Sequence, residues 1–331
     1  MLDNENSTVT ADMATHRHDT QPADLTPTRR SPARRSKVAR RQAWRAGLYS
    51  LLLLPVLALA EPGFWLATKD GHNLWLMGSI HVGQDSFYPL PAVVEEAWNK
   101  ADVLIVETDL HNMSASDNAE IAQMSRLPAG QTLQQVLPPA LYQQTVAAAK
   151  PLGLDAQAMQ PMRPWVVAIT LIQQSLQKAG YQPQLGVDEH FTQAAARMGV
   201  PVRGLERVPE QFAYLAGLSN MEQDFLSSTL EQMKSMDQEI PQMMQAWQDG
   251  NGQLLQKLLN DEKASPALQE YMERRLLRER NHNWLPRLLA MPEKNQFMVV
   301  GALHLYGPDG LLNLLRHAGY TLTLQTEPTV R

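Results

Sequence analysis

Two histidines are the leading candidates for chemistry, because each closes a short apolar run and follows a glycine by three residues. His81 ends the stretch 74–81, which contains Gly78, and His304 ends the stretch 297–304, which contains Gly301. Glycine permits sharp turns and close backbone approach, so each imidazole could face a crevice at the end of a strand. Such a histidine binds a metal or transfers a proton. The alternative for either one alone is a hydrogen-bonded structural histidine.

Two glutamates also close apolar runs. Glu107 directly follows the run 103–106, and Glu206 follows the short run 200–205. If these runs are parallel strands, both carboxylates reach the sheet edge that carries His81, where either one could act as a general base. The alternative for Glu107 is to cap the next helix or to pair with an arginine.

Two imidazoles and one carboxylate form a familiar ligand set for a divalent metal with an open position for water. His81, Glu107 and His304 are therefore the candidate metal ligands, and with Glu206 they are also the candidate catalytic residues. The chain has no cysteine, so thiolate metal sites, iron–sulfur clusters and a cysteine nucleophile are excluded. Ser79 lacks the G-x-S-x-G elbow that an exposed serine nucleophile requires.

Three further residues are candidates for substrate binding. Arg280 and Asn281 lie in the charged run 273–280 and just after it, a run that mostly reads as a solvated helix face. Arg280 could clamp a substrate carboxylate or hold Glu107. Asp188 precedes a helix, where its simplest role is to interact favourably with the helix dipole.

His111 and His282 lack the strand–glycine setting and read as surface residues, and His72 reads as a turn residue.

Strand patterns occur at both ends of the chain. An Asp-Gly pair between the runs 64–68 and 73–77 predicts a hairpin. Helical spacing over 89–100 and a buried run at 103–106 then predict a parallel strand–helix–strand unit. Towards the other end, further patterns predict strands at 200–205, 296–300 and 320–325, with helices over 114–180, 187–198, about 209–290 and 310–317. The expected fold is α/β, or α+β-like, with a central mixed sheet built from the chain's two ends and large helical insertions between them.

The first 60 of the 331 residues have the features of a targeting segment. Residues 1–45 form a polar, basic leader that we expect to be disordered. Residues 46–60 are apolar but short for a membrane span, and Ala58-Leu59-Ala60 is a cleavage signature, so the sequence predicts export to the periplasm or outside the cell. The alternative is an uncleaved inner-membrane anchor that holds the protein at a membrane surface.

We expect residues 61–331 to form one domain with a helical insertion over about 209–290. The net charge of the chain is −5, and residues 1–60 hold 9 Lys and Arg against 5 Asp and Glu. The body is therefore acidic, which argues against nucleic acid as a partner.

Several short motifs in order resemble the TraB/GumN family, which is similar to the Tiki proteins that cleave Wnt. They are Gly-Ser-Ile-His at 78–81, Val-Glu-Thr-Asp at 106–109, Gly-Val-Asp at 186–188, Gly-Leu-Glu at 204–206 with Glu-Gln at 210–211, Glu-Arg-Asn at 279–281 and Gly-Ala-Leu-His at 301–304. The resemblance covers about residues 62–326.

The resemblance implies a single α/β domain in which His81, Glu107 and His304 form the site. In the Tiki branch these motifs support peptide hydrolysis that depends on a divalent metal, manganese or cobalt. Related folds include esterases that need no metal and haem-binding proteins. The sequence thus leaves three functions open, which are a metal-dependent hydrolase of peptidase type, a metal-free hydrolase of esterase type, and a non-catalytic haem or ligand-binding protein. The substrate would be a peptide or a small molecule.

Overall fold

A computed structural model describes residues 63–259 and 264–326. The predicted leader (1–45) and apolar signal segment (46–60) lie outside these residues. Within the two described ranges, no helix combines the length and apolarity needed to cross a bilayer.

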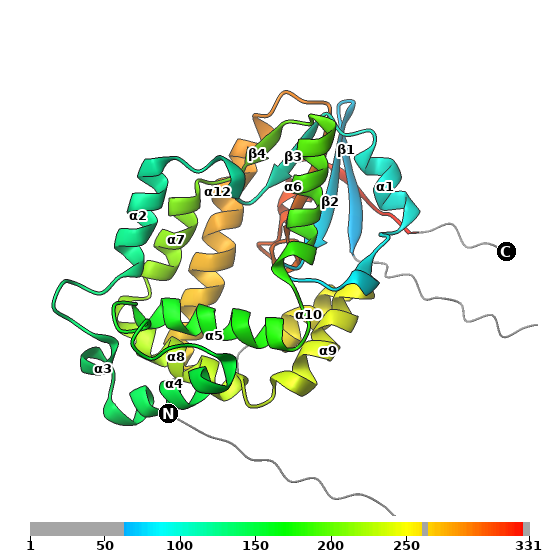
Figure 1. The fold of residues 1–331 in the computed structure, drawn as a ribbon. Helices are drawn as coiled ribbons and strands as arrows, with labels where there is room; N and C mark the ends of the chain where they lie inside the picture. The colour runs from blue at the N-terminus through cyan, green and yellow to red at the C-terminus, as the bar shows by residue number, and fades with distance from the viewer. Residues whose placement is uncertain (1–62, 260–263, 327–331) are drawn as a thin grey trace, which may run out of the picture. The chain divides into compact units, whose positions relative to one another are not determined.

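Six strands form one mixed sheet in the order β4-β3-β5-β2-β1-β6 (Figure 1). The strands are β1 (Phe64–Lys69), β2 (His72–Ser79), β3 (Val103–Val106), β4 (Val202–Gly204), β5 (Asn295–Gly301) and β6 (Thr321–Leu324). The predicted fold class, an α/β protein with a sheet built largely from the two ends of the chain, is confirmed.

The predicted hairpin joins β1 and β2 in antiparallel register, with Lys69 opposite His72. Only Asp70 and Gly71 form the loop, and both have positive φ, 49° and 78°. This is the backbone conformation that a tight two-residue hairpin requires, and an Asp-Gly pair adopts it readily. The turn is therefore shorter than the sequence predicted, and His72 opens β2 instead of lying in the turn.

Strands β2 and β3 are parallel to one another but are not neighbours. Strand β5, from far along the chain, lies between them and pairs in parallel with both. Strand β4 pairs in parallel with β3 on its other side. The carboxyl ends of all four strands consequently meet at one edge of the sheet, where binding crevices of open α/β sheets form.

Helices cover both faces of the sheet, because side chains alternate along each strand. On β3, Leu104 and Val106 pack into one cluster with α1 (Ala92–Trp98), α6 (Val187–Met198) and α9 (Met236–Gln248). Val103 and Ile105 pack into the opposite cluster with α12 (Glu279–Leu289) and α13 (Leu311–His317). The sheet therefore lies between two layers of helices.

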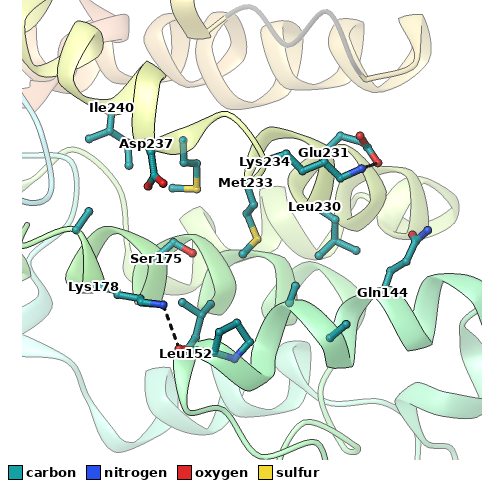
Figure 2. A pocket seen from close by; sticks show the side chains of 15 residues that line it. Gln144, Leu152, Ser175, Lys178, Leu230, Glu231, Met233, Lys234, Asp237 and Ile240 are labelled. Carbon is teal, nitrogen blue, oxygen red and sulfur yellow. Dashed lines mark hydrogen bonds and ion pairs between the residues drawn. The ribbon is translucent and has the colours of Figure 1, made fainter.

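The other helices follow the predicted helical stretches. They are α2 (Ala115–Ser125), α3 (Leu133–Val136), α4 (Pro139–Ala149), α5 (Pro164–Lys178), α7 (Val208–Ala216), α8 (Glu222–Gln232), α10 (Gly252–Leu259) and α11 (Pro266–Tyr271). A cavity of about 570 Å³ lies between α4, α5, α8 and α9 (Figure 2). Its lining is largely apolar, with Lys178, Lys234 and Asp237 among the polar residues, and it contains none of the predicted site residues. The candidate chemistry therefore lies elsewhere, at the sheet edge.

Candidate functional site

His81 lies just beyond β2 and pairs with Asp188 in the first turn of α6. Its Nδ1–H donates to Asp188 Oδ2 at 3.0 Å, and Ser79 Oγ donates to the other carboxylate oxygen at 2.7 Å. The Asp188 carboxylate raises the pKa of His81 to about 9, and this effect outweighs the opposing effect of desolvation. The His81 side chain is 69% exposed. Its Nε2, for which the described part of the chain supplies no hydrogen-bond partner, is left for water or a substrate.

Two close backbone contacts, at Gly83 and Gly186, form a clasp that holds the His81–Asp188 pair in place. Gly83 exchanges two backbone hydrogen bonds with Gln182, and the Val187 N–H donates to Ile80 O at 3.1 Å. A Cβ on Gly83 would lie 1.9 Å from Leu185 O, and one on Gly186 would lie 2.7 Å from His81 O. Only glycine permits such close approach, so the loop that carries His81 stays against the start of α6. No sequence pattern indicates this clasp, because it joins segments about 100 residues apart.

His304 lies in a short 3₁₀ turn, Ala302–His304, after β5 and is buried. Its Nε2 lies 3.0 Å from Arg280 NH1, and its Nδ1 lies 2.7 Å from Asn281 Oδ1. A guanidinium can only donate, so Nε2 accepts and Nδ1–H donates to Asn281. Burial, assisted by the charge of Arg280, lowers the pKa of His304 to about 3. The imidazole is therefore neutral and in a defined tautomer.

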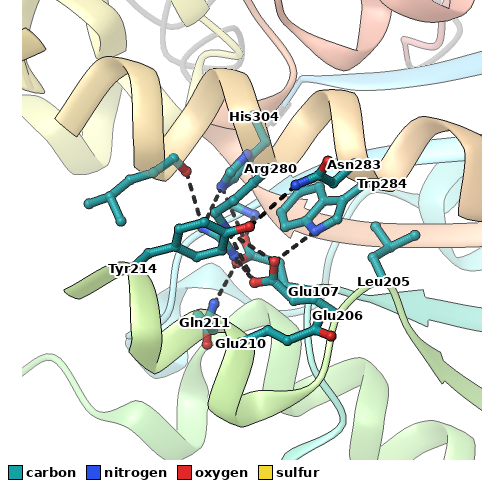
Figure 3. Close-up of polar contacts among 12 residues, drawn as sticks. Glu107, Leu205, Glu206, Glu210, Gln211, Tyr214, Arg280, Asn283, Trp284 and His304 are labelled. Atoms are coloured by element: carbon teal, nitrogen blue, oxygen red, sulfur yellow. Dashed lines mark hydrogen bonds and ion pairs between the residues drawn. The ribbon is translucent and has the colours of Figure 1, made fainter. Parts of the chain in front are cut away.

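Arg280, on α12, lies at the centre of the buried network in Figure 3. Its Nε donates to Glu206, its NH2 group donates to Glu107 and Glu206, and its NH1 group donates to His304 and to the carbonyl oxygen of Leu276. All five N–H groups of the guanidinium are thus engaged. Arg280 holds Glu107, which is one of the two roles that the sequence left open.

Glu107 is buried at the end of β3 and is satisfied on both oxygens. Oε1 accepts the Gly301 N–H at 2.8 Å, and Oε2 accepts from Arg280 and from Gln211 Nε2 at 2.9 Å. Burial on its own raises the pKa of this carboxyl, but the interactions with His304, Arg280, His81 and the Gly301 N–H together outweigh it and hold the pKa well below its usual range. Glu107 is therefore a fixed anion.

Glu206 lies directly after β4 and is buried on the far side of Arg280. One oxygen accepts from the guanidinium at 2.6 Å, and the other accepts from Trp284 Nε1 at 2.9 Å. Burial raises its pKa, although the bonds to Arg280 and Trp284 oppose the rise. The Trp284 ring also lies against the His304 ring, with centroids 4.4 Å apart.

Two members of the network, Gln211 and Trp284, have no role that the sequence predicts. Gln211 occurs only within the motif at 210–211, and Trp284 lies outside the motifs. The signal for Trp284 is its position one helical turn after Arg280 on α12, which places both side chains on the same face.

Gly301 marks the point where the two histidines meet. A Cβ built on this residue would lie 3.0 Å from Glu107 Oε1, 3.6 Å from His304 Cδ2 and 4.0 Å from His81 Nε2. Both imidazoles and the carboxylate therefore converge on one small space that the absent side chain leaves free. The tertiary structure brings together His81, Asp188, Glu107, Glu206, Arg280, Asn281 and His304.

Two of the histidines outside the site, His111 and His282, lie at the surface. His111 pairs with Glu189 at 3.2 Å, and His282 pairs with Asp309 at 2.7 Å. More than half of each imidazole is exposed, as the sequence predicted for these two residues.

The divalent metal that the family resemblance implies does not fit this arrangement. Both nitrogens of His304 and both oxygens of Glu107 are already engaged, and a permanent cation, Arg280, contacts both residues. Among residues 63–259 and 264–326, no group of three or more His, Asp or Glu side chains is placed to hold a metal ion.

Fold and site together define a mixed α/β protein with a buried arginine–glutamate–histidine network at the carboxyl edge of its sheet. The model of the TraB/PrgY/gumN family matches residues 63–324, so the chain belongs to this family and the resemblance read from the motifs is confirmed.

The chain is 29% identical over 266 residues to "Uncharacterized protein YbaP" of Escherichia coli (strain K12), an alignment that covers 76% of this chain and 96% of the relative. It is 26% identical over 313 residues to "Metalloprotease TIKI1" of Danio rerio, covering 77% of this chain and 61% of the relative. No solved structure matches the fold.

Proposed function

We propose that this protein is a hydrolase that cleaves an amide or ester bond, with His81 as the residue that activates water. The observation that carries the proposal is the exposed His81–Asp188 pair, whose free Nε2 faces Glu107 across the side-chain gap at Gly301. A histidine oriented by a carboxylate through Nδ1, with Nε2 directed into open space, is the arrangement of a general base.

The proposed reaction has two proton transfers. Neutral His81 takes a proton from water at Nε2 while the water oxygen bonds to the carbonyl carbon of the substrate. Asp188 and the Glu107 anion stabilise the imidazolium that forms, since both raise the pKa of His81. When the bond to the leaving group breaks, the imidazolium returns the proton to the departing nitrogen or oxygen. Glu107 thus acts as a fixed charge, and Glu206 as a positioning residue that acts through Arg280.

Mutation of His81 tests the proposal against fluorogenic peptides and p-nitrophenyl esters. Because general base catalysis contributes about 10²–10⁴-fold, we expect His81→Gln to lower kcat/KM by at least about 100-fold without a large change in Tm. His111→Gln is the matched control, because His111 forms a similar pair with Glu189, which lies next to Asp188 on α6. Hydrolysis that survives in His81→Gln but not in His111→Gln would contradict the assignment.

Filling the gap at Gly301 is a second test. Its φ of −47° suits any residue, so Gly301→Ala acts through its new methyl group alone. That methyl would lie 3.0 Å from Glu107 Oε1, in the space proposed for water and the carbonyl carbon. We expect a loss of activity of about tenfold or more, since small displacements from reactive geometry are costly. Unchanged kcat/KM would place the reaction elsewhere.

A metal-dependent peptidase is the second candidate, and it rests on one observation, that a relative is named a metalloprotease. It requires Arg280 to leave Glu107 and His304. Exhaustive chelation distinguishes the two candidates, because activity that is lost and then restored by manganese or cobalt supports this alternative. We do not propose haem ligation by the two histidines together, because neither nitrogen of His304 is free to ligate iron.

A further inference from the structure

We propose that Arg280 is the built-in cation of this site and that it keeps divalent metals away from Glu107 and His304. In the proposed hydrolase, a fixed protein charge then lies where a divalent metal shared by Glu107 and His304 would otherwise lie. This proposal rests on the proposed function for its chemical meaning only, because its test measures metal binding and not turnover.

The Arg280 guanidinium already occupies atoms of Glu107 and His304 that would be metal ligands. Its NH2 group bonds to Glu107 Oε2 and its NH1 group bonds to His304 Nε2, and a metal shared by Glu107 and His304 would need a ligand atom from each of these residues. The Nε2 lone pair can serve only one partner, a proton donor or a metal. Metal binding to His304 through Nε2 therefore first requires this hydrogen bond to break.

The surroundings of Arg280 resist its displacement. The residue is 6% exposed, its guanidinium lies 4.6 Å from the centroid of Trp284, and Glu206 holds it from the side opposite Glu107. Moving it aside would leave Glu206 buried and without its cation, which is costly. Adding a divalent ion beside it would place like charges together in a site of low dielectric.

The backbone just before α12 helps to orient the Arg280 side chain. A π-helix, Met272–Arg278, directly precedes α12, and such widened turns are frequent at functional sites. Leu276, within this π-helix, offers its carbonyl oxygen to Arg280 NH1 at 3.2 Å. The segment before α12 thereby contributes one of the five bonds that fix the guanidinium, so its orientation is set by the local backbone as well as by the two glutamates.

Manganese binding by the intact, untagged protein is the decisive measurement. After chelator treatment and gel filtration, Mn²⁺ is titrated and followed by electron paramagnetic resonance, in parallel with Glu107→Gln and His304→Gln. We expect either no bound manganese or binding that both variants retain, which would locate it outside this site. Stoichiometric binding by the wild type that either variant abolishes would overturn the inference.

A gain of binding is the complementary measurement. Arg280→Met with Glu206→Gln removes the cation together with one buried negative charge, which limits the loss of stability. We expect this double variant to bind Mn²⁺ at least about tenfold more tightly than the wild type, the scale on which groups around a metal site change affinity. Arg275→Met is the control, because Arg275 lies in the π-helix just before α12 but bonds to Glu279 instead. A folded double variant that gains no affinity would also overturn the inference, and if it does not fold, the wild-type titration decides.

Discussion

At the scale of residues, the same spacing produces two histidines in opposite states. Asp188 accepts from His81 Nδ1, so the exposed ring is readily protonated. Asn281 accepts from His304 Nδ1 and Arg280 donates to its Nε2, so the buried ring stays neutral. The anionic partner raises the pKa of His81, whereas burial, with the cation Arg280 alongside, lowers the pKa of His304, so only His81 is readily protonated at neutral pH.

Replacing Asp188 with asparagine should lower the pKa of His81 from about 9 towards about 6.5, its usual value. Because the neutral imidazole is the base, wild-type kcat/KM should rise with pH up to about pH 9, and this rise should shift to lower pH in Asp188→Asn. An NMR titration of the imidazole ring measures the same pKa without a substrate. Glu189→Gln, next along α6, is the control.

The His81–Asp188 pair also stabilises the folded protein in a pH-dependent way. Because the pKa of His81 is raised in the folded state, this contribution to stability is complete below about pH 6.5 and is lost as pH rises through about pH 9. Asp188→Asn should therefore destabilise the protein in urea unfolding at pH 6 but not at pH 10. A deficit that is equal at both values would show that Asp188 stabilises the fold by some route other than the charge of His81.

At the scale of elements, helix α12 supplies much of the buried network. Arg280, Asn281 and Trp284 all come from this helix, and they contact Glu206, Glu107 and His304 at the ends of three strands. The run 273–280 read as a solvated face in the sequence, because charge alone does not show which arginine turns inward. Only Arg280 in that run is buried, because Glu107 and Glu206 pair with its guanidinium in the interior.

The clasp between the His81 loop and α6 predicts an effect of Gly186→Ala. Gly186 has φ of −64°, so alanine causes no backbone strain, but its Cβ would lie 2.7 Å from His81 O. We expect a loss of about 1–3 kcal/mol in unfolding free energy, the usual cost of overpacking, together with a lower His81 pKa as Asp188 moves away. Urea unfolding and the NMR titration measure the two effects.

Gln193→Ala is the control for this variant, because Gln193 lies on α6 and its side chain donates to the partly exposed Glu189, away from the clasp. A destabilised Gly186→Ala in which His81 keeps its pKa would separate the clasp from the alignment of the His81–Asp188 pair.

At the scale of the whole molecule, insertion of β5 between β2 and β3 assembles the site. His81 and Glu107 come from the first third of the chain, and His304 comes from near its end. Because β5 is parallel to both neighbours, Gly301 and His304 arrive beside the ends of β2 and β3. The site therefore forms only when the two ends of the chain have joined in one sheet.

The sequence also predicts how the mature protein begins. If residues 46–60 are a signal that is cleaved after Ala60, N-terminal sequencing of the protein exported by a Gram-negative host should start at Glu61. This start lies shortly before β1, which begins at Phe64, so the described sheet would remain whole. A full-length chain that stays in the membrane fraction would instead support the anchor alternative.

The sequence alone determined the elements and most of the site residues, because these are local properties. Alternating or continuous apolar runs fix strands, the Asp-Gly pair fixes the hairpin, and polar residues just after strands must lie at a sheet edge. The helix over 187–198 with its glycine cap and the run 103–106 appear in the structure with the predicted bounds.

Only the tertiary structure decided the order of the strands and the state of each site residue. The predicted strand–helix–strand unit gave parallel strands but could not reveal that β5 separates them, because pairing between distant segments leaves no local pattern. Likewise, nothing adjacent to His304 in sequence shows that Arg280 occupies its Nε2, whereas Asp188 leaves the Nε2 of His81 free. Protonation and metal affinity depend on which charges lie within a few ångströms, and folding alone sets those distances.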